Sequence, residues 1–299
     1  MRATPPLLDL LTTWRADPVT IVILVGASVL YALGMRTAAR RGSPWPRSRA
    51  VAFYALGLGS YALVELGFLG TWSSELRWAF VARIALLLLA VPGLIALGRP
   101  LDLLRVCLSP AARQRVDAVL DGRVFRVLGN AMFATLFAAA VFCVFLTPLA
   151  GVLRTSPVLG EAIGVVTLGA GLVLVVPMMA LTGIHTSTFL AIEFLLAFVE
   201  LVIDSIPGIL LRLNDTIVDG VTTLTPGAAW WPNPLHDQHL AGDLLWFIAE
   251  VADVPILIIL LVRWHRRDRR EAASFDELTD EEHDALVQAH LRGVRAADG

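Results

Sequence analysis

Residues 86–110 read LLLLAVPGLIALGRPLDLLRVCLSP, and they decide the fold class of this chain. The stretch begins as an apolar helix, is interrupted at Pro92-Gly93, and leaves the apolar region at Gly98-Arg99-Pro100. A break inside a helix that is otherwise compatible with lipid is tolerated only where neighbours satisfy the freed backbone groups. The stretch therefore predicts a packed bundle of membrane helices and not an isolated anchor.

The composition of the whole chain agrees with a helical membrane protein. The 299 residues are 57% hydrophobic and 17% charged, with a mean hydropathy of +0.71, whereas soluble domains carry about 25% charged residues. The formal net charge of −2 provides no bulk positive field, so we expect no nucleic-acid partner. The chain contains no lysine, which excludes a retinal Schiff base. Its two cysteines, Cys107 and Cys143, fall in a loop and inside a helix, so we expect no disulfide.

Seven stretches have the length needed to cross a bilayer, about 20 apolar residues each. They are residues 19–35, 50–70, 78–98, 127–153, 161–183, 188–211 and 241–263. Arginines gather after the first, third and seventh stretches, whereas the alternate connections hold few, such as Arg77 and Arg154. The positive-inside rule then places the N-terminus outside and the C-terminus in the cytoplasm, which requires an odd number of spans. We predict an all-α, polytopic, multi-pass bundle in the lipid bilayer of a bacterial plasma membrane.

The chain divides into three predicted parts. Residues 1–18 form an extracytoplasmic interfacial segment, and residues 19–265 form the seven-span membrane domain. Residues 266–299 form a cytoplasmic tail, in which Thr279 and Glu282 make a capping box that starts a short helix.

Two ionisable residues, Glu65 and Arg83, fall inside the second and third predicted spans. Such residues are costly in a membrane and are functional candidates by default. Each lies about five residues from the outer end of its span, so the helical hairpin brings them to a similar depth where they can pair. The residues leave two interpretations open: an ion pair that locks two helices, or a functional role.

A second group of acidic residues lies on the last two predicted spans and is called the acidic seam. Its members are Glu193, Glu200 and Asp204 on the sixth span and Asp243, Glu250 and Asp253 on the seventh. Steps of seven and four residues keep the first three on one helical stripe. We expect Asp204 and Glu250 at comparable depth in the outer half. The carboxylates of the seam are suited to hold a cation or to relay protons. The alternative is that some of them are protonated, or that Arg83 and Arg212 neutralise their charge.

His236 and His239 stand just before the seventh span and share a face if that segment is helical. Imidazole suits copper or zinc, so this pair is the candidate metal site, with a polar interfacial loop as the alternative. No histidine within a predicted span is placed to activate a nucleophile, so we predict no enzymatic activity.

Three short elements of the chain resemble those of the CtaG-like cytochrome c oxidase assembly factors. The segment VPGLIALGRP at 91–100 is similar to their A-P-P-L-L-x-L-G-x-P element, FLTPL at 145–149 to an element ending the fourth span, and DQHLAGDLLW at 237–246 to D-Q-x-x-A-G-x-x-M-W. The residues that carry the resemblance are Pro92, Gly93, Gly98, Pro100, Thr147, Pro148, Asp237, Gln238, Gly242 and Trp246.

The resemblance implies a multi-span plasma-membrane protein that helps to build haem-copper oxidases and handles copper. It also implies an H-x-x-x-H pair in the third span, and here those two positions are Phe80 and Ile84. The histidines implied for the fifth and sixth spans fall near Gly164 and Asp204. The chain therefore matches the family's elements but not its intramembrane histidines.

The leading hypothesis is a non-enzymatic assembly factor or scaffold for a haem-copper cytochrome c oxidase, with oxidase subunits as partners and copper as the only candidate cofactor. One alternative is a transporter of a cation or small solute that uses the acidic seam. Another is a structural subunit of a respiratory complex.

Overall fold

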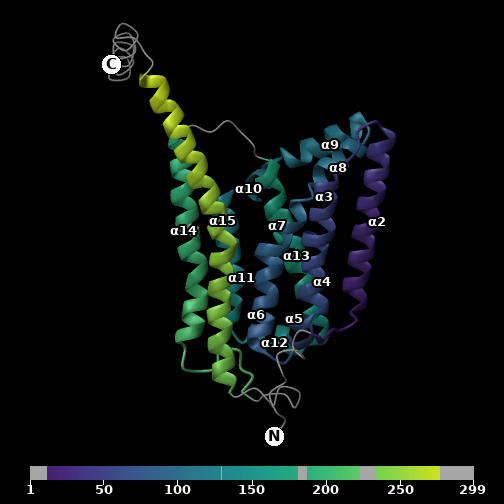
Figure 1. Cartoon of the computed structure of the whole chain (residues 1–299). Coiled ribbons are helices and arrows are strands. Elements are labelled where there is room, and N and C mark those ends of the chain that lie inside the picture. Colours follow the sequence, from purple (N-terminus) through teal and green to yellow (C-terminus); the bar gives the residue numbers. More distant parts are fainter. Residues whose placement is uncertain (1–11, 129, 181–186, 223–232, 277–299) are drawn as a thin grey trace.

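The computed structural model describes residues 12–128, 130–180, 187–222 and 233–276, and every regular element within these ranges is a helix. The helices stand side by side as a bundle, with short helices lying across one end (Figure 1). The predicted all-α class is confirmed. The predicted interfacial segment is described only from residue 12 onward, and the helix predicted to follow Thr279 lies outside the described residues.

The long helices of the bundle are built from one segment or from several consecutive ones. The first half of the chain contributes α2 (Pro18–Arg40), α3 (Arg47–Val51), η1 (Ala52–Leu58), α4 (Gly59–Leu66), α5 (Phe68–Trp72), α6 (Arg77–Ala85), η2 (Leu86–Ala90) and α7 (Val91–Ala96). The short helices across one end are α8 (Pro100–Cys107), α9 (Pro110–Leu120) and α10 (Arg123–Leu128). The second half contributes α11 (Ala131–Cys143), η3 (Val144–Leu146), α12 (Leu149–Thr155), α13 (Pro157–Ala180), α14 (Ser187–Leu213) and α15 (Pro234–Asp276).

Four of these helical stretches are long and apolar enough to cross a membrane, and a bent fifth stretch passes the same test if its two halves count as one. The four are Pro18–Arg40, Arg47–Trp72, Arg77–Ala96 and Pro157–Val175. They correspond to the first, second, third and fifth predicted spans, and α14 and α15 cover the sixth and seventh. The count of seven spans and the orientation of the termini stay predictions.

The fourth predicted span is not the continuous helix expected over 127–153. Met132–Leu146 and Leu149–Thr155 are bent by 83° relative to each other at Thr147-Pro148. Thr147 adopts an extended backbone conformation, because the ring of Pro148 disfavours helical geometry in the residue before it. The predicted span over 127–153 is therefore bent, a feature that apolar content does not report.

The third span is the central helix of the bundle. Of its 18 most apolar residues, 72% are buried inside the protein, and its residues belong to both large apolar cores. Phe80, Ile84 and Leu88 face a core shared with α11, α14 and α15. Val91 and Ile95 face a core shared with α2, η1 and α13. This helix therefore joins the two halves of the bundle.

The expected interruption at Pro92-Gly93 takes the form of wide helical turns, not of a gap. The turn before Pro92, Leu86–Ala90, is π-helical. Because proline has no N–H, the carbonyl of Leu88 loses its usual helical donor. That carbonyl points at Gly171 of α13, whose missing side chain leaves room: a Cβ there would lie 2.5 Å from Leu88 O and 2.5 Å from Pro92 Cγ. The neighbour that accommodates the distorted helix is therefore a glycine.

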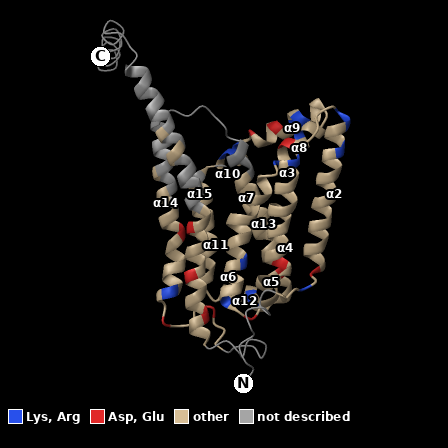
Figure 2. Cartoon of the chain, in the orientation of Figure 1, with Lys and Arg blue, Asp and Glu red and all other residues tan. Residues whose placement is uncertain are grey.

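Charge is distributed unequally between the two ends of the bundle. Basic residues predominate where α2 ends and α8 and α9 lie, and the opposite end carries residues of both signs (Figure 2). The two cysteines are free, as expected, and Cys107 donates to the carbonyl of Gly34.

We expect Gly171→Ala to destabilise the protein, because the new methyl group meets backbone and proline ring at 2.5 Å. Overpacking of this kind costs about 1–3 kcal/mol. Gly169→Ala is the matched control on the same helix, because nothing lies within 4 Å of its added Cβ. Thermal unfolding of the purified full-length chain in detergent measures both. Equal midpoints for the two variants would contradict the close contact between α13 and the third span.

Candidate functional site

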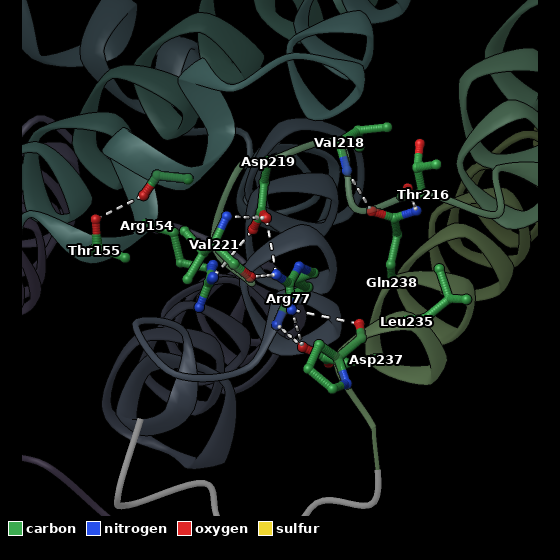
Figure 3. A network of polar contacts seen from close by, with 12 residues as sticks. Arg77, Arg154, Thr155, Thr216, Val218, Asp219, Val221, Leu235, Asp237 and Gln238 are labelled. Atoms are coloured by element: carbon green, nitrogen blue, oxygen red, sulfur yellow. Dashed lines mark hydrogen bonds and ion pairs between the residues drawn. The ribbon is translucent and has the colours of Figure 1, made fainter. Parts of the chain in front are cut away.

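Arg77, the first residue of α6, is the centre of a buried group of charges that we call the Arg77 network (Figure 3). One Nη lies 2.8 Å from Asp219 Oδ1, and the other lies 3.4 Å from Asp237 Oδ2. The same guanidinium also donates to the carbonyls of Val221 and Pro234. It therefore ties three segments to one another: the start of the third span, the connection after α14, and the start of α15.

Arg154, from the end of α12, completes the network. Its Nη2 lies 3.1 Å from Asp219 Oδ2, and its Nη1 donates to the carbonyl of Ser74 at 2.8 Å. Asp219 thus sits between two guanidiniums, and its Oδ1 also accepts from the N–H of Val221. Two arginines and two aspartates balance in charge, which buried ions require.

Asp237 does more than neutralise Arg77. Its carboxylate accepts from the backbone N–H of Arg77 at 2.9 Å and of Trp78 at 3.3 Å. These are two of the N–H groups that the start of a helix leaves without an intrahelical partner. Asp237 therefore caps α6 from another helix, where the helix dipole also favours a negative charge. Burial raises the pKa of Asp237, against the opposing effect of these N–H donors and of the arginines.

Gln238, the next residue, holds the connection after α14 in place. Its Oε1 accepts from the N–H of Val218 at 2.9 Å, and its Nε2 donates to the carbonyl of Thr216 at 2.8 Å. His239 adds a contact between its Nε2 and the carbonyl of Asn214 at 3.2 Å. Both Asp237 and Gln238 are fully buried. Consecutive side chains at the start of α15 thus bind two different parts of the protein.

A second buried group of charges, the Arg83 network, lies about 9 Å further along the same helix, given a rise of 1.5 Å per residue. Arg83 Nη2 lies 2.8 Å from Glu65 Oε2, and both side chains are almost fully buried. The ion pair predicted between the second and third spans is therefore confirmed. Glu161 and Arg15 extend it, since Arg15 Nη2 lies 2.7 Å from Glu161 Oε1 and 3.7 Å from Glu65 Oε2.

The Arg83 network depends on a close approach of α13. Arg83 Nη1 donates to the carbonyl of Gly160 at 3.0 Å. One turn later, a Cβ on Gly164 would lie 2.5 Å from Arg83 Nη2 and 2.9 Å from Glu65 Oε1. A glycine at this position therefore leaves room for the ion pair between the helices, and a larger residue would shift the ends of the Arg83 and Glu65 side chains.

The acidic seam is described only in part. Asp204 is buried where α14 packs on α15. Gly208 lies against Trp246, so the next turns of these helices bring Asp204 and Glu250 to a similar level, in keeping with the expected common depth. Glu250 accepts from the indole N–H of Trp246 at 2.6 Å. Arg212 pairs with Asp243 at 3.1 Å. The side chains of Glu193, Glu200 and Asp253 lie outside the described part of the structure.

Sequence reasoning missed most members of the Arg77 network. Arg77 and Arg154 counted only as isolated charges of the outer connections, and Asp219 stood in a long connection without a distinctive pattern. The one usable signal was that both arginines occur alone in segments that are otherwise poor in basic residues. Periodicity could not find them, because a loop that folds back between helices has no period.

The sequence matches the model of the cytochrome c oxidase caa3 assembly factor family, Caa3_CtaG, over residues 29–267. The chain belongs to this family. The resemblance carried by the three short elements is thereby confirmed.

Curated relatives of this Caa3_CtaG protein occur in mycobacteria. Uncharacterized proteins of Mycobacterium bovis and Mycobacterium tuberculosis are each 26% identical over 289 residues, which is 93% of this chain and 43% of theirs. A protein of Mycobacterium leprae is 24% identical over 287 residues, 92% of this chain and 43% of its own. The chain thus spans less than half the length of these relatives. No solved structure matches it.

The elements that suggested the Caa3_CtaG family shape the contacts between helices. Gly98 lies against Phe53 and accepts from the Tyr31 hydroxyl at 2.8 Å. Pro100 begins α8. Gly242 lets α15 approach α14 so closely that a Cβ would lie 2.6 Å from Gly208 O and 2.7 Å from Arg212 N. The other family residues also lie where helices bend or meet: Thr147, Pro148, Pro92, Asp237, Gln238 and Trp246. Gly93 is the exception among the family residues, because nothing lies within 4 Å of a Cβ added to it.

Three of the four positions at which the resemblance implies intramembrane copper ligands carry no donor for a metal, and the fourth lies near the carboxylate of Asp204. Phe80 and Ile84 carry hydrocarbon side chains and lie in the apolar core. Gly164 has no side chain and borders the Arg83 network. Nowhere in the described ranges do three His, Cys, Asp or Glu side chains gather as a metal site would need. His236 and His239, both in the first turns of α15, remain as two imidazole donors, the second against the Asn214 carbonyl.

We expect Asp237→Ala to destabilise the Caa3_CtaG chain strongly. The change leaves Arg77 with one carboxylate and removes the cap of α6, and breaking a buried ion pair costs about 3–5 kcal/mol. Asp243→Ala, six residues later on the same helix, removes a pair whose members are 47% and 50% exposed and should cost about 1 kcal/mol or less.

The midpoints of thermal unfolding of the two purified variants measure this difference in stability. Asp237→Asn should fall between them, because an amide oxygen still accepts from an N–H but carries no charge. An Asp237→Ala variant as stable as Asp243→Ala would rule out the structural role of the Arg77 network.

Proposed function

We propose that this chain is a non-enzymatic membrane scaffold in the assembly of a haem-copper cytochrome c oxidase, acting as a multi-pass protein of a bacterial plasma membrane. Its membership of the Caa3_CtaG family supports a role in oxidase assembly, and its long apolar helices support a membrane location. The curated relatives are more than twice as long, so the proposal concerns the part of the function that this region supplies.

The observation that carries the proposal is how the family elements are used. The side chains of Asp237 and Gln238 form hydrogen bonds with the start of α6 and with the connection after α14. Gly98 and Gly242 have no side chain, and this allows neighbouring helices to approach closely. Residues used in this way fix the shape of a bundle and leave few donors for a ligand, which suits a protein that presents a rigid surface to a partner.

The composition of the apolar core also supports a scaffold. A carrier of copper within the bundle needs sulfur or imidazole donors facing one another inside it. The side chains facing one another around positions 80 and 84 are aromatic and aliphatic, with Phe80 against Phe145 at 5.9 Å between ring centres. This supports a scaffold that positions oxidase subunits more than a protein that passes copper through its interior.

We expect deletion of the gene to lower cytochrome c oxidase activity and the amount of assembled oxidase subunits in the membrane. Plasmid-borne Asp243→Ala should restore both, and Asp237→Ala should not, because the scaffold loses its shape. The measurements are oxygen consumption with reduced cytochrome c and the haem absorbance of isolated membranes.

An immunoblot for the chain itself separates loss of function from loss of the protein. Normal oxidase in the deletion strain would refute the assembly role. Co-purification of the chain with mature oxidase at a fixed stoichiometry would instead favour a structural subunit.

Copper handling, if it belongs to this chain, is proposed for His236 and His239, which provide two imidazole nitrogens. We expect wild-type protein loaded with copper and then desalted to retain less than one equivalent, because two nitrogen donors make a weak site. The double variant His236→Ala/His239→Ala should retain none, as measured by elemental analysis.

His265→Ala, which changes an exposed histidine at the other end of α15, is the control and should behave as the wild type. Tight stoichiometric copper that survives the double substitution would contradict this proposal and indicate ligands elsewhere in the chain.

A further inference from the structure

The end of the bundle opposite the two charge networks carries a hollow that the assembly role leaves unused. It is open, has a volume of about 640 Å³, and lies between the end of α2 and the short helices α8 and α9. Its polar lining consists of Arg41, Ser43, Arg105, Arg113, Gln114 and Asp117. We call it the basic hollow.

Hydrogen bonds hold two of the three arginines of the basic hollow, Arg41 and Arg105, and the third, Arg113, makes a longer ion pair. Arg41 Nη1 donates to the carbonyls of Val106 and Leu108 at 2.8 Å each, which ties the end of α2 to the end of α8. Arg105 Nε lies 2.9 Å from Asp117 Oδ1, and Arg113 Nε lies 3.8 Å from Asp117 Oδ2. The lining thus has three positive charges against one negative charge, and just outside it Asp102 Oδ1 lies 3.6 Å from Arg105 Nη1. Both buried networks, in contrast, are neutral.

The lining of the basic hollow also contains the apolar residues Val106, Leu108 and Pro110, and α8 and α9 carry exposed apolar side chains outside it. Leu104 on α8 is 46% exposed, and Val119 on α9 is 59% exposed. Figure 1 shows α8 and α9 lying across the end of the long helices, and Figure 2 shows basic residues in and beside them. Helices with both exposed arginines and exposed apolar residues, placed where membrane-spanning helices end, are suited to the boundary between lipid headgroups and acyl chains.

We propose that the basic hollow binds the phosphate of an anionic phospholipid of the surrounding bilayer, with the guanidiniums of Arg105 and Arg113 as its main donors. Guanidinium groups match the geometry of phosphate oxygens. A membrane lipid is the occupant, and not a soluble phosphate, because Val106, Leu108 and Pro110 of the lining offer apolar contacts that only an acyl chain uses. The site would hold a lipid whether or not the chain assembles an oxidase.

The test is the binding of dioctanoyl phosphatidylglycerol to the purified full-length chain in a neutral detergent, followed by native mass spectrometry. Dioctanoyl phosphatidylcholine is the zwitterionic comparison. We expect the wild type to prefer phosphatidylglycerol, and Arg105→Gln/Arg113→Gln to lose about fivefold in affinity for each arginine removed.

The matched control is Arg115→Gln/Arg123→Gln, which removes the same charge from exposed positions outside the hollow and should keep the preference. Asp117→Asn, which raises the charge of the lining, should strengthen binding by a similar factor. Measuring each variant's unfolding midpoint beforehand ensures that only folded protein is compared.

Three results would overturn the proposal: equal binding of the two lipids by the wild type, equal losses in the hollow and control variants, or displacement of the lipid by glycerol 3-phosphate at equal concentration. The last result would identify a soluble phosphate as the occupant. None of these results depends on oxidase activity, so failure here and failure of the assembly role are distinguishable.

Discussion

Two arginines in the most deeply buried helix of the bundle impose the constraint on which the rest of the structure depends. Arg77 and Arg83 lie on the third span, between two apolar cores. A buried charge is tolerated only with a partner and with its hydrogen bonds satisfied. The partners come from α4, α13, α15 and the connection after α14. The ion pairs that neutralise the two arginines of this helix thus also hold the neighbouring helices in place around it.

Backbone groups impose a second constraint, which glycines and one carboxylate meet. A helix distorted before Pro92 presents the Leu88 carbonyl to its neighbour, and α13 supplies Gly171 there. The free N–H groups at the start of α6 find Asp237 from α15. In a membrane these groups have no water to bind. The contacts between helices therefore depend on single residues. For this reason we expect a substitution at such a residue to change the stability of the protein strongly, and a substitution a few residues away to change it little.

The two ends of the bundle differ in what they offer to other molecules. At one end, charges of both signs are buried and neutral in sum, and ion pairs join them across several helices. At the other end, arginines line an open hollow beside exposed apolar residues. The arginines at this end are the ones from which the orientation of the chain was predicted, and that orientation stays a prediction.

Composition and periodicity by themselves determined the helical membrane class, because apolar stretches of about 20 residues have few other uses. The pairing of Glu65 with Arg83 also followed from the sequence, since two helices joined by a short turn have matched depths. The three short elements identified the family, because proline, glycine and a capping carboxylate mark particular local geometries. Only the tertiary structure decided the bend at Thr147-Pro148 and the meeting of Arg77, Arg154, Asp219 and Asp237. These contacts join segments distant in the chain, and no local pattern records which loop will fold back between which helices.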